Sequence, residues 1–504
     1  MKSIKFKVIS LSRQSCKMGL LFVLTMCWAG EVDAATWYVA KSGNDSNTGK
    51  TEIEAFLSIQ KAIDNSSSGD MIVVASGSYD YISVPAEKAP ITIKSRERVS
   101  DTIINGCTDH RCVTVGENGT TTNVYIEGFT LTGGRLLDWG NSGAGVMGGT
   151  YSDCIISNNM SGSGSTAGGA YKCTLNSCIV CNNSCSDWTG GMEECIASNC
   201  VIACNESTHV GAGGAVNCIL VHCTITNNTT TGSAGGSCGA CTLYGCFIEG
   251  NHVVGGTSGA DLNSSTAHNC IIKATKTENC IMASRCYNCT IVGTANSPRI
   301  GRDNYFYNCI IARQGATNFY MAGEKFFGVY FFNCCLYDVE CLDYVYEESS
   351  INLCPGFAGD YDYSLQDGSP CVDAGDNSYV STDIDYSGNQ RIAGVSVDIG
   401  AYEYIPLTCA INSISAVQRY PWNGFVDVTL DFTSSDTSTA VEFVLKVKNV
   451  EDNTITTCRS FIVDGVSTSI LTFKSGKRSF VWNASADLPS GFNSERMKLI
   501  VETK

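Results

Sequence analysis

Charged residues, proline and long apolar runs are all scarce in this chain of 504 residues. Asp, Glu, Lys and Arg make up 16% of it, and there are only 8 prolines. Acidic residues outnumber basic ones by 49 to 33, so the chain lacks the basic excess with which proteins displace counterions from nucleic acids. A hydrophobic share of 43% excludes global disorder, because so apolar a chain buries enough surface to fold.

One apolar run stands out, near the N-terminus. Residues 1–34 combine five Lys or Arg side chains, an apolar stretch from Met18 through Trp28, and a candidate cleavage point after Ala34. This order is typical of a secretory signal peptide. The alternatives are a membrane anchor, for which the run is short, and a lipoprotein at Cys27. No later segment reaches the about 18 apolar residues of a membrane helix, so we expect an exported chain, secreted or at the cell surface, whose mature part does not span a membrane.

Glycine and cysteine, by contrast, are abundant, with 51 and 29 residues. An exported chain rich in cysteine is usually held together by disulfides. Here the cysteines follow a period instead: Cys, any residue, then a residue that is mostly Ile or Val returns every 22 to 24 residues. The copies begin at Cys154, Cys178, Cys200, Cys223, Cys246 and Cys270, and looser ones follow at Cys289, Cys309 and Cys334.

Three further columns keep the same step. A second cysteine precedes the first by five residues, an asparagine follows it by five, and a glycine pair comes before the second cysteine. Their members are Cys173, Cys195, Cys218 and Cys241; Asn159, Asn183, Asn205, Asn228 and Asn251; and the glycine pairs at 168–169, 190–191, 213–214 and 235–236. Chance clustering of common residues does not hold phase in this way, so we interpret the columns as a structural repeat.

The repeat predicts an all-β fold, a right-handed parallel β-helix with coils of about 23 residues. Helical repeats are longer and need stretches with a 3.6-residue period, and the Leu framework of leucine-rich repeats is missing. Each unit instead holds two or three short alternating runs, with Gly and Asn at the corners, where a positive φ is tolerated. Three strands and three turns per coil would stack every residue about 4.8 Å above its equivalent.

Stacking turns each column into a ladder inside the coil. Cysteine then acts as a small buried apolar residue beside Ile or Val, and the asparagines stack their amides, each bonding the next. Disulfides between equivalent cysteines of adjacent coils are not expected, because their Cβ atoms point in parallel at about 4.8 Å. Cys107 and Cys112, which flank a turn, are better candidates, and a few bridges are plausible. We predict that most coil thiols stay free.

Zinc is the alternative use of these cysteines. The CxxC pairs are Cys178/Cys181, Cys238/Cys241 and Cys286/Cys289. A structural zinc site needs four ligands that converge on one point, whereas the columns spread the cysteines along an axis. We therefore predict no metal site and no cofactor.

The ends of the repeat differ from its middle. We predict an N-terminal cap and first coils over residues 35–110, with a short amphipathic helix over 56–63, and regular coils over 111–355. A C-terminal cap then covers 356–405. Alternating segments at sandwich-like spacing predict a separate β-sandwich over 406–504.

The loop with Asp383, Asp385 and Asn389 surrounds a glycine turn in the predicted C-terminal cap. Its carboxylate and backbone oxygens could hold Ca²⁺, although the loop lacks the spacing and bidentate Glu of an EF-hand. The alternative, which we favour, is that acidic side chains tie turns of the cap together and that Arg391 pairs with one of them.

Two segments resemble known bacterial families. WYVAKSGND at 37–45, IQKAID at 59–64 and GDMIVVASGSY at 69–79 resemble the start of bacterial right-handed parallel β-helix proteins. SPCVDAGD, DIDYSGNQRIAG and VDIGAYE, all within 360–404, resemble the choice-of-anchor Q domain of exported bacterial proteins.

Weaker resemblances complete the comparison. Gly-Gly-Ala at 168–170 and 213–215 is similar to polymorphic outer membrane protein repeats, although the Phe of their Phe-x-x-Asn motif is mostly Ile, Val or Thr here. RYPWNG at 419–424 and VWNA at 481–484 are similar to accessory sandwich modules of such proteins. These resemblances imply an exported surface protein with no defined reaction.

An enzyme must still be weighed, because β-helices also carry polysaccharide lyases and glycoside hydrolases. Hydrolysis needs two carboxylates that face a cleft, and lyase chemistry needs a base and usually Ca²⁺. The coil acids share no column, so we do not expect them to meet on one face: Asp153, Asp187, Glu193, Glu194, Glu206, Glu249, Asp261 and Glu278. Glu193-Glu194 could be half of a site, and a solvated turn is the alternative.

The basic and histidine side chains are scattered as well. The histidines of the coils are out of phase with one another: His209, His222, His252 and His268. We therefore name no catalytic residue. We expect a monomeric, non-catalytic β-helix in adhesion or glycan contact, whose partner is a polysaccharide or cell-surface ligand; the alternative is a polysaccharide lyase or glycoside hydrolase.

Overall fold

The structure is a computed structural model of the chain. It describes residues 34–119, 123–137, 142–231, 235–254, 259–275, 279–294, 299–314, 320–321, 328–341, 345–406, 409–419, 423–435, 440–450, 453–488 and 497–503. The predicted signal peptide lies outside these ranges except for Ala34, so the structure does not test it. In the described ranges no helix is long and apolar enough to cross a membrane.

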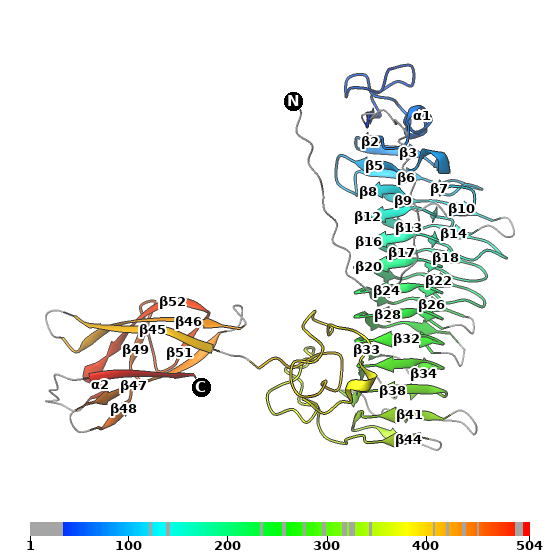
Figure 1. The fold of residues 1–504 in the computed structure, drawn as a ribbon. Helices are drawn as coiled ribbons and strands as arrows, with labels where there is room; N and C mark the ends of the chain where they lie inside the picture. Colours follow the sequence, from blue (N-terminus) through cyan, green and yellow to red (C-terminus); the bar gives the residue numbers. More distant parts are fainter. Residues whose placement is uncertain are drawn as a thin grey trace, which may run out of the picture.

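The described residues between 36 and 348 wind into a parallel β-solenoid whose coils stack into long sheets (Figure 1). Sheet A has fourteen strands in the described chain. They are β1 (Thr36–Val39), β2 (Met71–Val74), β5 (Ile91–Ser95), β8 (Val124–Glu127), β12 (Thr150–Ser152), β16 (Thr174–Asn176), β20 (Ile196–Ser198), β24 (Ile219–Val221), β28 (Thr242–Tyr244), β32 (Thr266–His268), β35 (Arg285–Tyr287), β38 (Asn304–Tyr307), β41 (Val329–Phe332) and β44 (Val345–Glu348).

Sheet B follows sheet A in each coil and has twelve described strands. They are β3 (Gly77–Asp80), β6 (Thr102–Asn105), β9 (Thr130–Thr132), β13 (Ile155–Ser157), β17 (Ile179–Cys181), β21 (Val201–Ala203), β25 (Thr224–Thr226), β29 (Phe247–Glu249), β33 (Ile271–Ala274), β36 (Thr290–Gly293), β39 (Ile310–Arg313) and β42 (Cys335–Tyr337).

Sheet C closes each coil, again with twelve described strands. They are β4 (Ile82–Val84), β7 (Val113–Val115), β11 (Val146–Met147), β15 (Ala170–Tyr171), β19 (Met192–Glu193), β23 (Ala215–Val216), β27 (Cys238–Gly239), β31 (Leu262–Asn263), β34 (Asn279–Met282), β37 (Arg299–Ile300), β40 (Tyr320–Met321) and β43 (Glu340–Cys341).

The middle coils carry a fourth strand that we did not predict. Sheet D lies between sheets B and C: β10 (Arg135–Leu136), β14 (Met160–Ser161), β18 (Ser184–Cys185), β22 (Glu206–Ser207), β26 (Thr229–Thr230) and β30 (His252–Val253). From β14 to β30, each strand directly follows an asparagine of the ladder. Because that side chain is fixed in the interior, the next residues stay extended and pair with the coils on either side.

The corners between strands are made by single residues of positive φ. Between sheets A and B these include Ser177, Asn199 and His222, with φ values of 52°, 53° and 50°. Asparagine is common there, as predicted, because it tolerates the left-handed region. The positive φ reverses the alternation of side chains at the corner, so the cysteine or asparagine that follows the corner residue points into the interior.

The predicted cysteine ladder is present in the structure. Cys154, Cys178, Cys200, Cys223, Cys246, Cys270, Cys289, Cys309 and Cys334 are each at most 1% exposed and belong to one apolar core. Backbone amides tie successive members together: the Cys178 N–H donates to Cys200 Sγ at 3.3 Å and the Cys223 N–H to Cys246 Sγ at 3.4 Å. The cysteines of this ladder are thiols in the structure.

The bridge considered between Cys107 and Cys112 is not formed. Cys107 is exposed, whereas Cys112 is buried and donates from Sγ to Asn159 Oδ1 at 3.3 Å. The turn therefore sends the two side chains in different directions, one to solvent and one into the coil.

The asparagine ladder is also present. Nδ2 of Asn159, Asn183, Asn205 and Asn228 each donates to Oδ1 of the next member at 3.0 to 3.1 Å. Asn251 ends the ladder by donating to Asp261 Oδ1 at 3.1 Å.

The N-terminal end is covered by the predicted helix, α1 (Ile59–Asn65), at the top of the solenoid in Figure 1. Ser58 caps it by accepting a hydrogen bond from the Lys61 N–H, and Ile59, Ala62 and Ile63 are buried against the first coil. A short 3₁₀ helix, η1 (Ala86–Lys88), follows at the edge of the next coils.

The segment 356–405 contains one 3₁₀ helix, η2 (Asn377–Tyr379), and otherwise consists of turns. It packs against the side of sheet B rather than only over the end of the coil. Its Leu365, Cys371 and Ile399 form one apolar cluster with Ile310, Ala312 and Cys335 of that sheet. We refer to residues 356–405 as the lateral cap.

The C-terminal module is a separate antiparallel structure. One sheet orders β45 (Cys409–Gln418), β46 (Phe425–Ser434), β52 (Gly476–Asn483), β49 (Phe461–Val463) and β50 (Val466–Thr468). The other contains β48 (Ile455–Thr457), β47 (Val441–Asn449), β51 (Leu471–Phe473) and β53 (Met497–Thr503), and α2 (Ala484–Asp487) follows β52. Both enclose one apolar core, which includes Leu430, Phe443 and Phe480. The predicted fold class, a parallel β-helix with a C-terminal β-sandwich module, is therefore confirmed.

Candidate functional site

The predicted acidic residues are distributed over several walls of the solenoid. Glu193 lies on sheet C, Glu206 on sheet D and Glu249 on sheet B. Asp261 is buried, where it ends the asparagine ladder. Glu278 lies outside the described residues, and within them no three acidic, His or Cys side chains form a group that could hold a metal ion.

Glu193 and Glu194 do not form the solvated turn that we considered. Glu193 is 5% exposed, and its carboxyl accepts a hydrogen bond from Trp188 Nε1 at 3.1 Å, with Thr189 Oγ1 at 3.5 Å. Burial raises the pKa of the Glu193 carboxyl to about 8, so it is protonated at neutral pH. Glu194 is exposed and lies 3.7 Å from Lys172 Nζ.

The loop with Asp383, Asp385 and Asn389 uses its buried carboxylate internally. Asp385 accepts hydrogen bonds from the backbone N–H groups of Asn389 at 2.7 Å and Glu403 at 2.9 Å. Arg391 is also buried; it donates to the carbonyl oxygens of Asp398 and Gly400, and its Nη1 lies 3.7 Å from Glu403 Oε2. These contacts are those of side chains that tie turns together.

Sequence reasoning missed two columns of aromatic side chains on the outer face of sheet A. One column, which we call the inner column, lies at the strand ends from which the chain continues to sheet B. It consists of the last residue of each of five successive strands: Tyr244, His268, Tyr287, Tyr307 and Phe332. Neighbouring rings are nearly parallel, with centroids 4.8 to 5.0 Å apart. The distance between neighbouring rings equals the distance between neighbouring strands of the sheet, because each strand supplies one ring.

The lateral cap covers part of this inner column. Tyr379 packs its ring on Tyr307 at 4.7 Å between centroids, and Ser381 Oγ lies 2.6 Å from His268 Nδ1. His268 is almost fully buried, and burial lowers the pKa of its imidazole to about 4. It is therefore a neutral member of the stack at physiological pH.

The outer column, which we call the tyrosine ladder, consists of Tyr305, Tyr330 and Tyr346. These residues pair across β38, β41 and β44, and their ring centroids are 4.7 and 4.9 Å apart at interplanar angles of 7° and 10°. The Arg285 guanidinium lies 5.3 Å from the Tyr305 ring centroid, at the other end from Tyr346. Tyr346 is 52% exposed. The ladder thus presents ring edges and hydroxyl groups to solvent at the spacing of the coils.

A pattern in the sequence could have pointed to these columns. The strings Tyr-Phe-Tyr at 305–307 and Tyr-Phe-Phe at 330–332 alternate an inward phenylalanine with two outward rings. Inside the solenoid Phe306 and Phe331 stack on each other as well, with centroids 5.0 Å apart. Because the coils differ in length here, the sequence does not show which residues of successive strands are neighbours. The strand pairing of sheet A shows it.

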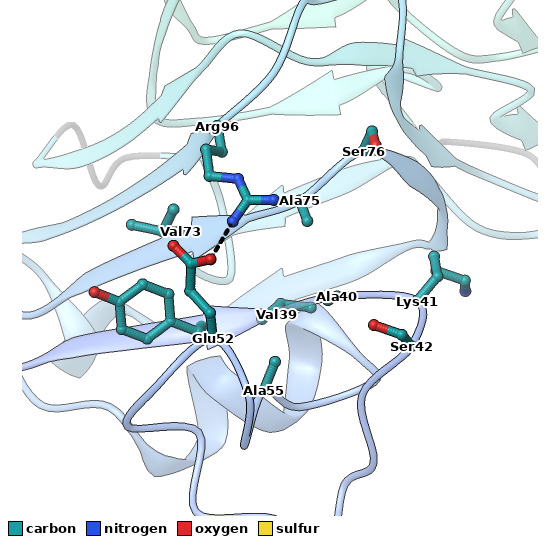
Figure 2. Close-up of a pocket in the computed structure, with 11 residues that line it drawn as sticks. Val39, Ala40, Lys41, Ser42, Glu52, Ala55, Val73, Ala75, Ser76 and Arg96 are labelled. Atoms are coloured by element: carbon teal, nitrogen blue, oxygen red, sulfur yellow. Dashed lines mark ion pairs between the residues drawn. The ribbon is translucent and has the colours of Figure 1, made fainter.

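A small hollow lies at the N-terminal end, between β1, β2 and the loop before α1 (Figure 2). Its volume is about 350 Å³, and its lining includes Tyr38, Lys41 and Ser76. Arg96 Nη1 and Glu52 Oε2 form an ion pair across it at 2.8 Å, as the dashed line in Figure 2 shows. Since these two charges neutralise each other, we do not choose this hollow as the functional site.

Comparisons with known proteins leave the family open. No protein-family model matches the chain, and no curated protein matches it, so the resemblances drawn from the sequence stay predictions. Solved structures with a similar fold include pectate lyase Pel9A, with 12% identity, a TM-score of 0.38, and coverage of 73% of this chain and 96% of that one. XylC in complex with xylose shares 11% identity at a TM-score of 0.39, covering 73% and 98%.

A third similar structure is the tailspike protein gp49 of Acinetobacter baumannii bacteriophage Fri1, a capsular polysaccharide depolymerase. It shares 9% identity at a TM-score of 0.28, with 93% of this chain and 89% of that chain covered. At such low identities and TM-scores we draw no functional conclusion from these matches.

Proposed function

We propose that the protein is secreted or displayed at the cell surface, where it binds an extended polysaccharide along the outer face of sheet A without modifying it. The observation that carries this proposal is the tyrosine ladder. Aromatic side chains with a polar tip are enriched at binding surfaces, because the ring supplies apolar contact and the hydroxyl supplies a hydrogen bond. Here three of them stand in a row on a rigid sheet.

The spacing of the ladder suits a polymer that runs parallel to the solenoid axis. Each coil offers one tyrosine, and the rings repeat at 4.7 and 4.9 Å. A sugar unit of an extended glycan is of similar length, so successive sugars meet successive hydroxyl groups. Sugar C–H groups also pack on aromatic surface, most readily on the half-exposed Tyr346.

The charge of the chain favours a neutral glycan. Its formal net charge is −16, which repels strongly anionic polymers at long range. Burial, the neighbouring Tyr305 and Tyr346, and Asp303 all raise the pKa of the Tyr330 hydroxyl from its ordinary value of 10.0, so it is protonated at neutral pH. A protonated phenol both donates and accepts hydrogen bonds, as sugar hydroxyls do.

The test is a glycan array with the full chain and two variants. Tyr330→Ala removes the central ring of the ladder. Tyr125→Ala is the matched control, because Tyr125 is exposed on the same face and in the same register column but lies between Thr92 and Thr150. We expect neutral polysaccharides to bind the wild type and Tyr125→Ala and to be lost in Tyr330→Ala. Equal binding by all three proteins would refute the proposal.

A glycoside hydrolase is the second candidate, and Glu193 is the observation that favours it. A carboxyl that is protonated at neutral pH is what a general acid requires, and the neighbouring Trp188 is 39% exposed, so it could contact a sugar. Asp187 lies on the same loop, but its carboxylate already accepts from the Gly164 N–H at 2.8 Å and lies 3.0 Å from His209 Nδ1.

Reducing-sugar and unsaturated-product assays on the polysaccharides that bind distinguish the two candidates. We expect no turnover. Turnover that disappears in Glu193→Gln, with binding retained, would establish the hydrolase instead.

A further inference from the structure

Two cysteines meet where the lateral cap packs on the solenoid. Cys335 is the first residue of β42 on the outer face of sheet B, and Cys371 lies in a turn of the lateral cap. Both are 0% exposed, and both belong to the apolar cluster that includes Ile310, Leu365 and Ile399. Cys335 belongs to sheet B and is covered by the lateral cap, and Cys371 belongs to the lateral cap and is covered by sheet B.

Both cysteines are thiols in the structure and pack in the same apolar cluster, where Cys335 Sγ donates a hydrogen bond to the Leu353 carbonyl oxygen at 3.2 Å. The backbone on both sides holds them there: the Cys335 N–H donates to the Cys309 carbonyl oxygen at 2.9 Å, and the Ile399 N–H donates to the Cys371 carbonyl oxygen at 2.9 Å. Ser369 Oγ also accepts from the Cys371 N–H at 3.1 Å.

This arrangement differs from that of the cysteine ladder. Ladder members lie on successive parallel coils, so their side chains point the same way and their Cβ atoms are separated by about 4.8 Å, beyond the usual range for a disulfide. Cys335 and Cys371 approach from opposing layers instead, and opposed side chains allow their Cβ atoms to come closer than one strand spacing.

We propose that Cys335 and Cys371 are the site of a disulfide that fastens the lateral cap to sheet B. The oxidant is a low-molecular-weight disulfide. The thiolate of one cysteine attacks it and releases one small thiol, and the other cysteine then displaces the second small thiol. In balance, two S–H bonds and the small disulfide's S–S bond break, the protein's S–S bond forms, and two electrons and two protons pass to the small thiols.

Burial sets when this exchange happens. Thiols that are fully covered do not meet an external disulfide, so the bond forms while the chain folds or when the lateral cap lifts from the sheet. Once formed, it closes the loop from 335 to 371 and stabilises the contact by constraining the unfolded chain. The lateral cap also carries Tyr379 and Ser381 to the inner aromatic column, so the bond holds that contact too. This inference does not depend on glycan binding.

The test maps the thiols of the full chain after export into an oxidising bacterial periplasm. The protein is purified without reductant, denatured, alkylated without reduction, digested and analysed by mass spectrometry. We expect one linked peptide pair, Cys335 with Cys371, lighter than the two thiol peptides by two hydrogen atoms, and alkylated ladder cysteines. Alkylation of both residues in most molecules, or a bridge from either one to the exposed Cys354, would overturn the proposal.

A second measurement uses the thermal midpoint of unfolding with and without reductant. We expect reductant to lower the midpoint of the wild type and of Cys223→Ser, a ladder control, and to leave that of Cys371→Ser unchanged. The same reductant effect in Cys371→Ser would contradict the assignment, because another bridge would then be responsible. If Cys371→Ser does not fold, the mapping of the wild type decides alone.

Discussion

Asn205 shows why a side chain can be required at one position of every coil. Its Nδ2 donates to the Val180 carbonyl oxygen at 2.9 Å and to Asn228 Oδ1 at 3.0 Å, and its Oδ1 accepts from both the backbone N–H and Nδ2 of Asn183 at 3.0 Å. The amide thus has partners for both donors and both lone pairs inside an apolar coil. No other side chain of this size satisfies the same four bonds.

Replacing Asn205 by alanine therefore leaves several buried polar groups without partners. We expect Asn205→Ala to lower the free energy of unfolding by about 3 kcal/mol, since each unpaired buried group costs about 1–3 kcal/mol. Urea unfolding followed by circular dichroism measures it. The control is Asn176→Ala on sheet A, which loses a single part-buried hydrogen bond from Ser198 Oγ at 2.7 Å and should lower the free energy of unfolding by only about 1 kcal/mol. An equally small effect at Asn205 would show that the ladder does not stabilise the coil.

Glu193 links stability to pH. Its carboxyl has an ordinary pKa of 4.5 and a folded pKa of about 8, so between these values the folded chain binds a proton that the unfolded chain releases. The stabilisation is complete below pH 4.5 and is lost as the pH rises through about 8.

Thermal unfolding from pH 5 to 9 of wild type and Glu193→Gln measures this linkage. The amide keeps a neutral side chain at every pH, so the variant should lose less stability than the wild type over that range. Glu403, whose pKa burial raises to about 7, stays in both proteins and cancels from the comparison. Parallel pH profiles would show that Glu193 is ionised in the folded protein.

At the scale of elements, the sequence predicted what repeats locally and missed what depends on distant contacts. The cysteine and asparagine columns keep phase over many coils, so they revealed the coil and its interior. Sheet D was missed because strands of two residues contain too little alternation to be recognised.

The placement of the lateral cap and the aromatic columns was missed for other reasons. His268 meets Ser381 across 113 residues of sequence, and no local pattern encodes such a contact. Tyr305, Tyr330 and Tyr346 are separated by 25 and then 16 residues, because the loops differ in length while the sheet keeps its register. A fixed-period search therefore does not find them.

The lateral cap is held by its own carboxylates. Since Asp385 already accepts from two backbone N–H groups, we expect neither Ca²⁺ nor EDTA to change the thermal midpoint of the wild type. Asp385→Ala should lower that midpoint by several degrees in either solution, since a buried network is broken. A rise of several degrees with Ca²⁺ in the wild type would show instead that the loop is a calcium site.

At the scale of the whole molecule, the distance between successive coils sets the distance between equivalent side chains on the outer surface of the solenoid. Every outward position of sheet A lies directly above the equivalent position of the next strand, so one tyrosine in each of three successive coils makes a straight row. Such a row recognises a polymer better than a small molecule, because each added unit of the polymer meets another identical contact. The acidic net charge of −16 then selects among polymers before contact is made.

The most direct test of this account is the dependence of affinity on glycan length. Calorimetric titration would use neutral oligosaccharides of increasing length, taken from the polysaccharide that binds most strongly. We predict that affinity rises with each added sugar until the chain spans Tyr305 to Tyr346, then levels off, and that Tyr330→Ala abolishes the rise while Tyr125→Ala does not. An affinity that is the same for a single sugar and for longer chains, or a rise that survives in Tyr330→Ala, would contradict it.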